Sequence, residues 1–157
     1  MFHRFHKKKT LGQGSLSSNQ FEKIIHFIGR KQMNIDGIGS ETIDQLYIAG
    51  LINNIADLYT LKKENLLPLD RMAEKSASNL LIAIENSISQ PFHKVLFSLG
   101  IRHVGETVAL NLVNHFETIE NLMDADFEEI ISVNEIGEKI ADSLLEYFII
   151  LSKLKNL

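Results

Sequence analysis

Apolar residues recur at helical spacing along most of the chain after residue 20. In residues 21–33, FEKIIHFIGRKQM, the side chains of Phe21, Ile24, Ile25 and Ile28 follow the i, i+3, i+4, i+7 spacing of one helix face. No segment alternates apolar and polar residues as a half-buried strand would. The pattern predicts an all-α fold with short connections. The other segments of helical character are residues 40–50, 54–69, 73–90, 91–100, 105–116, 118–125, 126–133 and 137–154.

Glycines and prolines mark the expected ends of these helices. Gly50 and Gly100 each close an apolar segment, as is typical of helix C-termini. Pro91 should halt the strong helix over residues 73–90, because the residue before a proline disfavours helical backbone. Residues 54–69 read as two short helices that meet around residues 60–63.

One nine-residue pattern occurs four times in the chain. The copies are IDGIGSETI from Ile35, LDRMAEKSA from Leu69, IRHVGETVA from Ile101 and VNEIGEKIA from Val133. Their starting positions lie 34, 32 and 32 residues apart. A near-constant period of this length indicates a repeated helical unit.

Each copy predicts a tight turn between two helices. The central apolar residue of each copy should point inward and fix the turn to the core: Ile38, Met72, Val104 and Ile136. The next residue is small, and we expect it to turn the backbone, at positive φ where it is glycine: Gly39, Ala73, Gly105 and Gly137. Four residues later the small side chains of Ala77, Ala109 and Ala141 should let two helices approach closely, whereas Ile43 departs from this pattern.

Such a turn leaves free N–H groups at the start of the following helix, which form a site for an anion. A DNA phosphate fits this chemistry, because the backbone rather than side-chain charge provides the donors. The alternative is a set of plain helix–helix turns inside a bundle. Four copies at one period favour the phosphate interpretation.

Composition limits the other functions that the chain can have. The 157 residues, 45% of them apolar, suit one domain or two small halves. The absence of cysteine excludes disulfides and thiolate metal sites and fits a reducing compartment. No apolar run is long enough to span a membrane, and no secretory signal is evident, so we expect a cytoplasmic protein.

Residues 1–20 are expected to be a disordered leader, an artificial extension or a remnant linker. His3 and His6 alone make a poor metal site, and the lysines at 7–9 are a weak candidate for a DNA-binding arm.

Charge is spread unevenly and does not favour general binding to nucleic acid. The net charge is −4, and residues 1–20 contain four basic residues and no acidic ones. Residues 21–90 contain 7 basic and 9 acidic residues, and residues 91–157 contain 5 and 11. A protein that holds nucleic acid through overall charge is expected to be basic, so a DNA interpretation must depend on the turns.

The turns resemble the helix–hairpin–helix motif, which binds the DNA backbone. Together with RKQMNIDGIGSETIDQL, LLPLDRMAEKSASNLLIAIENS and LFSLGIRHVGETVALNLVNHF, they are similar to the four-hairpin domain of bacterial NAD-dependent DNA ligases, over roughly residues 21–148. The resemblance implies a tandem helix–hairpin–helix domain of two (HhH)2-type units, in the SAM-like or RuvA domain 2-like class, over residues 21–90 and 91–157. In that family the domain follows a four-cysteine zinc finger, precedes a BRCT domain and grips nicked duplex DNA during replication and repair.

The sequence also departs from that family. It lacks the zinc-finger cysteines and the Lys-x-Asp-Gly motif of the adenylation lysine; its Asp-Gly at 36–37 follows Asn34-Ile35. Arg71, Ala73 and His103 stand where the family usually has glycine. The resemblance therefore implies a DNA-holding piece without catalytic residues, metal or cofactor of its own, whose parent uses NAD, Mg and Zn. Its partners would be nicked or duplex DNA and the other ligase domains.

We expect the backbone of the turns and nearby basic side chains to contact DNA phosphates, which gives salt-sensitive binding without sequence preference. The fourth turn, with Glu135 and Glu138 against Lys139, should be the weakest contact. The expected DNA-binding residues are Arg30, Lys31, Gly37, Ile38, Gly39, Arg71, Met72, Ala73, Lys75, Arg102, His103, Val104, Gly105 and Gly137.

Two other interpretations stay open at this point. The chain is also compatible with a stand-alone hairpin subunit of DNA repair or recombination, and with a helical protein–protein interaction module. His26, His93 and His115 are expected to pack on helices rather than to act as ligands or bases. The acidic residues between 117 and 129 fit a solvated face better than a cation site, and Asp126 is expected at a helix start.

Overall fold

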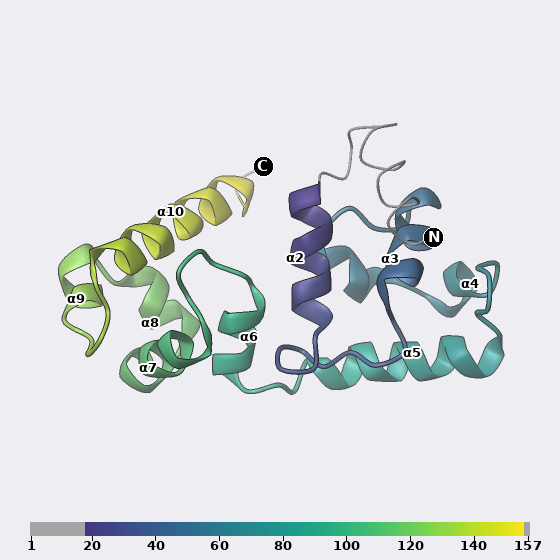
Figure 1. Ribbon diagram of the computed structural model, residues 1–157, viewed down its shortest axis with the longest axis horizontal. Coiled ribbons are helices and arrows are strands. Elements are labelled where there is room, and N and C mark those ends of the chain that lie inside the picture. Colours follow the sequence, from purple (N-terminus) through teal and green to yellow (C-terminus); the bar gives the residue numbers. More distant parts are fainter. Residues whose placement is uncertain (1–17, 156–157) are drawn as a thin grey trace. The chain divides into compact units, whose positions relative to one another are not determined.

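The structure of the chain, a computed structural model, describes residues 18–155 (Figure 1). These residues form helices joined by turns, and none of them lies in a strand, which confirms the all-α prediction. The chain divides into two compact units, the first ending at Gln90 and the second beginning at Pro91. His3, His6 and the lysines at 7–9 lie outside the described residues. The first helix in the described part of the chain begins at Ser18, so residues 18–20 are helical.

Over the residues that the structure describes, the first unit packs four α-helices and one 3₁₀ helix around its own core. Its fully buried side chains include Ile24, Ile43, Leu46 and Leu80, which come from three different helices. Apolar burial at these positions stabilises the unit, by about 1.5–3 kcal/mol for each large side chain. The elements are α2 (Ser18–Ile28), α3 (Ser40–Ile48), η1 (Ile55–Thr60), α4 (Lys63–Leu66) and α5 (Glu74–Ser87).

Local signals set the ends of these elements. α3 ends at Ile48, and Gly50 then adopts a left-handed backbone with φ of 76°. The Leu51 N–H donates to the Leu46 carbonyl at 2.9 Å, which is the hydrogen bond of a glycine-terminated helix. η1 begins with a capping box, in which the Asn54 side chain accepts from the Asp57 N–H and the Asp57 carboxylate accepts from the Asn54 N–H. The sequence predicts the glycine stop, and the structure confirms it.

The second unit has a core drawn from its own residues alone. The side chains of this core lie between Phe92 and Phe148, with Leu96, Leu112 and Leu144 fully buried. Thr118 and Asp126 cap two of its helices by accepting from backbone N–H groups, as expected for Asp126. The elements are α6 (Phe92–Ser98), α7 (Glu106–Phe116), α8 (Ile119–Asp124), α9 (Phe127–Ile131) and α10 (Glu138–Lys155). None of the helices in the described part of the chain is long and apolar enough to cross a membrane.

Candidate nucleic-acid interface

Each copy of the nine-residue pattern forms a turn between two helices. The turns join α2 to α3 and α4 to α5 in the first unit, and α6 to α7 and α9 to α10 in the second. In the last three copies the central apolar residue closes the turn through its backbone. The N–H groups of Met72, Val104 and Ile136 donate to the carbonyls three residues earlier, at 3.2, 3.0 and 3.1 Å.

The four turns share a left-handed residue at one position, but it is not the residue expected. Positive φ occurs at the third residue of every copy: Gly37 (85°), Arg71 (61°), His103 (69°) and Glu135 (65°). The small residue two positions later is extended, with φ of −120° at Gly39, −81° at Ala73 and −88° at Gly105. The expectation of positive φ at the glycines Gly39, Gly105 and Gly137 was therefore wrong. The chain reverses before the central apolar residue, and the small residue enters the helix as an N-cap, which requires extended backbone.

The inward-pointing residues lie as the sequence predicts. Ile38, Met72, Val104 and Ile136 are buried, with 5–8% of their surface exposed. The residues four after the small one, Ile43, Ala77, Ala109 and Ala141, are fully buried. Their N–H groups donate to the carbonyls of Gly39, Ala73, Gly105 and Gly137 at 2.8–3.1 Å, which is the first hydrogen bond of each helix.

These contacts narrow the set of backbone donors that a phosphate can use. The side chains of Ile38, Met72 and Val104 are buried, and the N–H groups of Met72 and Val104 are engaged inside their turns. The N–H groups of the N-cap and of the first helical turn have no acceptor within an α-helix. Within the predicted set, the candidate donors therefore lie around the exposed Gly39, Gly105 and Gly137, rather than at the buried central residues.

The surface beside these small residues is open. A Cβ atom built on Gly39, Gly105 or Gly137 would meet no other atom within 4 Å. Since the backbone of Gly39 and Gly105 is also extended, neither conformation nor internal packing requires glycine at these two positions. A missing side chain at an exposed helix N-terminus instead lets an external group approach the amides closely.

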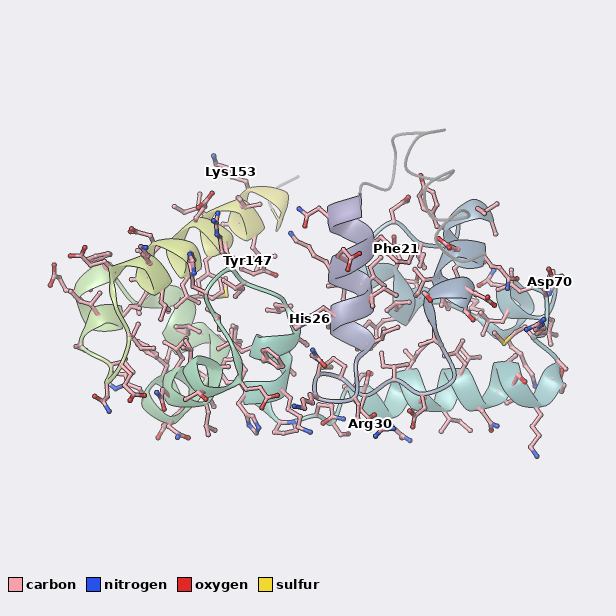
Figure 2. All side chains as sticks on the ribbon, in the orientation of Figure 1. Phe21, His26, Arg30, Asp70, Tyr147 and Lys153 are labelled. Atoms are coloured by element: carbon pink, nitrogen blue, oxygen red, sulfur yellow. The ribbon has the colours of Figure 1, made fainter. Side chains whose placement is uncertain are left out.

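The basic residues predicted for the interface are all exposed: Arg30, Lys31, Arg71, Lys75, Arg102 and His103. Arg71 and His103 occupy the left-handed position of their turns, and Arg102 directly precedes His103. Figure 2 shows the Arg30 side chain extending from the connection after α2. Nearby acids offset part of this charge, although Glu74, the first residue of α5, pairs with Lys63.

The first and second turns line the same small cavity. It has a volume of about 250 Å³, and the left-handed residues of the first two turns, Gly37 and Arg71, line it. Its other walls come from α3, the second turn and α5: Glu41, Thr42, Gln45, Asp70, Met72, Ser76 and Asn79. Arg30, Lys31 and Lys75 do not line this cavity.

In each unit an amide side chain on the helix after one turn bonds to the other turn, a contact that the sequence did not predict. The Asp70 N–H, in the turn before α5 (Figure 2), donates to the Gln45 Oε1 atom at 2.9 Å. In the second unit the Asn111 Nδ2 atom donates to the Glu135 Oε2 atom at 3.3 Å. Gln45 and Asn111 hold the same position, ten residues after the start of the first and third copies. That recurrence of an amide was the available signal.

Two histidines outside the turns contact neighbouring side chains. The His26 Nδ1 atom accepts a hydrogen bond from the Gln32 side chain at 3.0 Å. The His115 ring packs edge-on against Phe116. Among residues 18–155 there is no group of three or more His, Cys, Asp or Glu side chains placed to hold a metal ion.

Comparison with known proteins agrees with this geometry. Residues 94–152 match the model of the helix-hairpin-helix motif family. Proteins named DNA ligase are 56% identical over 126 residues in Phocaeicola vulgatus, 54% over 134 in Christiangramia forsetii and 53% over 127 in Anoxybacillus flavithermus. These alignments cover 80%, 85% and 81% of this chain, but only 19%, 20% and 19% of the relatives. The chain thus spans about a fifth of the length of the curated relatives it matches. It fits the C-terminal helix–hairpin–helix region of a bacterial DNA ligase, which confirms the resemblance predicted from the sequence.

Proposed function

We propose that this chain binds duplex DNA without sequence preference and serves as the DNA-holding part of an NAD-dependent ligase that seals nicks. The observation that carries the proposal is the repeated turn, with one left-handed residue and an open, extended N-cap in every copy that the angles describe. The relatives named DNA ligase support it, because a ligase must hold its DNA.

The proposed contacts are made mainly by backbone. N–H groups at the starts of α3, α5 and α7 would donate to phosphate oxygens, and the helix dipoles favour negative charge there. The start of α10, beside Glu135 and Glu138, would contribute least. Arg71 and Arg102, which lie within turns, would add charge-assisted contacts, with Arg30, Lys31, Lys75 and His103 in support. Such contacts hold the sugar–phosphate backbone and do not read bases, so this binding is independent of sequence.

The chemistry of sealing belongs to other parts of the proposed parent protein. We place the adenylation lysine, NAD, Mg and Zn outside this chain and assign it no catalytic residue. Its partners would be nicked or duplex DNA and the remaining ligase domains. Replication and repair in the bacterial cytoplasm are the proposed setting.

The test is a titration of the full chain with nicked duplex DNA over a range of salt concentrations, followed by fluorescence anisotropy. Arg71→Ala combined with Arg102→Ala should weaken binding about tenfold and reduce the slope of log affinity against log salt by about 2. Lys23→Ala combined with Lys153→Ala removes the same charge from α2 and α10 and should change affinity less than about threefold.

Equal losses in the two double variants would contradict the assignment of the turns. An unmodified chain that binds no duplex at low salt would contradict DNA binding itself, and would favour a protein–protein module.

A further inference from the structure

Glu135 places a negative charge where the other turns have none. It occupies the left-handed position of the fourth turn, where the first three turns have Gly37, Arg71 and His103. Its side chain is exposed. The Glu138 side chain, at the first residue of α10, is also exposed and lies three residues away in sequence. Glu74 and Glu106 hold the same place at the starts of α5 and α7, so the fourth turn differs from the others in the carboxylate at its left-handed position.

The Glu135 carboxylate is also held in place. The Asn111 Nδ2 atom, on the helix that follows the third turn, donates to the Glu135 Oε2 atom at 3.3 Å. The equivalent amide in the first unit, Gln45, accepts from a backbone N–H instead. In the second unit the same link therefore fixes a charged group on the turn, while in the first unit it fixes the turn backbone.

A left-handed backbone is unfavourable for glutamate. A residue with a Cβ atom in this conformation is strained relative to glycine, which the first turn has at the same position. The backbone alone therefore does not account for glutamate there. A carboxylate near the first turn of a helix is stabilised by the helix dipole.

We propose that Glu135 is an affinity-determining residue, whose carboxylate repels DNA phosphate from the fourth turn and leaves the backbone contacts to the first three. This inference rests on the proposed DNA binding. Like charges a few ångströms apart repel even in water, and this repulsion weakens as salt increases. The fourth helix–hairpin–helix turn then serves to complete the fold of the second unit rather than to hold DNA.

The experiment compares the full chain with Glu135→Gln, Glu135→Lys and Glu146→Gln in binding to nicked duplex DNA at several salt concentrations. Glutamine keeps an oxygen that can accept from Asn111 and removes only the charge. Glu146 is exposed and lies eight residues into α10, about 12 Å further along the helix, so Glu146→Gln is the matched control.

We expect Glu135→Gln to tighten binding about three- to fivefold, and Glu135→Lys about tenfold with a salt slope steeper by about 1. Glu146→Gln should change affinity less than about twofold. Circular dichroism confirms that each variant is folded.

Two results overturn the inference while the proposed function stands: an unmodified chain that binds but gains nothing from Glu135→Gln, or an equal gain from Glu146→Gln. If the unmodified chain shows no salt-dependent binding, the proposed function fails, and the inference fails with it.

Discussion

Each unit has two copies of the same turn, but the side chains at the left-handed position of the turn differ between the units. In the first unit the left-handed positions have glycine and arginine, and in the second histidine and glutamate. Residues 21–90 have a net charge of −2 and residues 91–157 of −6, with histidine neutral. The conformation is therefore set by the repeat as a whole, whereas the charge presented at each turn is set by one side chain.

The hydrogen bond from a helix to the other turn of its unit also differs between the two units. Gln45 accepts from the backbone of the second turn, and Asn111 donates to a side chain of the fourth. A shorter amide at the same position thus reaches a different group. The comparison teaches that equivalent positions in a repeat can conserve a contact while exchanging its donor and acceptor.

The largest expected effect tests whether each unit depends on its own core. Leu46 and Leu112 lie eleven residues after the start of the first and third copies, and both are fully buried. Leu46→Ala and Leu112→Ala should each reduce the unfolding free energy of their own unit by about 3 kcal/mol, because each leaves a cavity. Amide hydrogen exchange in α3 and α7 separates the two responses. Faster exchange of both helices in both variants would show that the units unfold together.

A second pair of variants tests the open surface beside the turns. Gly39→Val and Gly105→Val add a side chain where a Cβ atom meets nothing within 4 Å, on an extended backbone. Each should reduce the unfolding free energy by less than about 1 kcal/mol. Each should weaken binding to nicked duplex about tenfold, because the side chain blocks approach to the amides; anisotropy and thermal unfolding measure the two effects. Unchanged affinity in both variants would place the DNA elsewhere.

The left-handed position gives a smaller effect of opposite sign in the two units. Gly37→Ala puts a Cβ atom on a residue with φ of 85° and should destabilise the first unit by about 1 kcal/mol. His103→Gly relieves the same strain in the second unit and should stabilise it by less than about 1 kcal/mol, because glycine also gains freedom in the unfolded chain. Urea denaturation measures both, and a shared sign would refute the equivalence of the two positions.

The smallest effect concerns one ionisable group of the second unit. Burial raises the pKa of Tyr147 above its ordinary value of 10.0, because the charged phenolate is poorly solvated there. Above that pH the unfolded chain loses the proton before the folded chain does, so stability falls as pH rises towards the folded pKa. Thermal unfolding of Tyr147→Phe should lose this part of the alkaline decline, and an identical decline in the variant would contradict it.

The sequence predicts the helices and the buried side of each turn well, because local signals determine them. Periodic apolar residues mark the helices, Gly50 marks a helix stop, and Ile38 and Val104 are buried as their positions in the repeat require. The mistake over the glycines has a physical cause. Glycine tolerates positive φ but does not require it, and at Gly39 the chain needs extended backbone for an N-cap instead.

Contacts between a helix and a distant turn could not be predicted from local sequence signals. Gln45 and Asp70 are 25 residues apart, and Asn111 and Glu135 are 24 apart. Whether such side chains meet depends on how the helices pack, which no local pattern specifies. The occupied N–H groups of Met72 and Val104 likewise appear only once the closing hydrogen bonds of the turns are known.

The left-handed position accepts glycine, arginine, histidine and glutamate without altering the turn around it. A protein engineer can therefore change the charge at this position in one turn at a time, while the helices around it stay the same. A variant with arginine at all four positions would test how far the affinity for duplex DNA can rise before dissociation becomes slow.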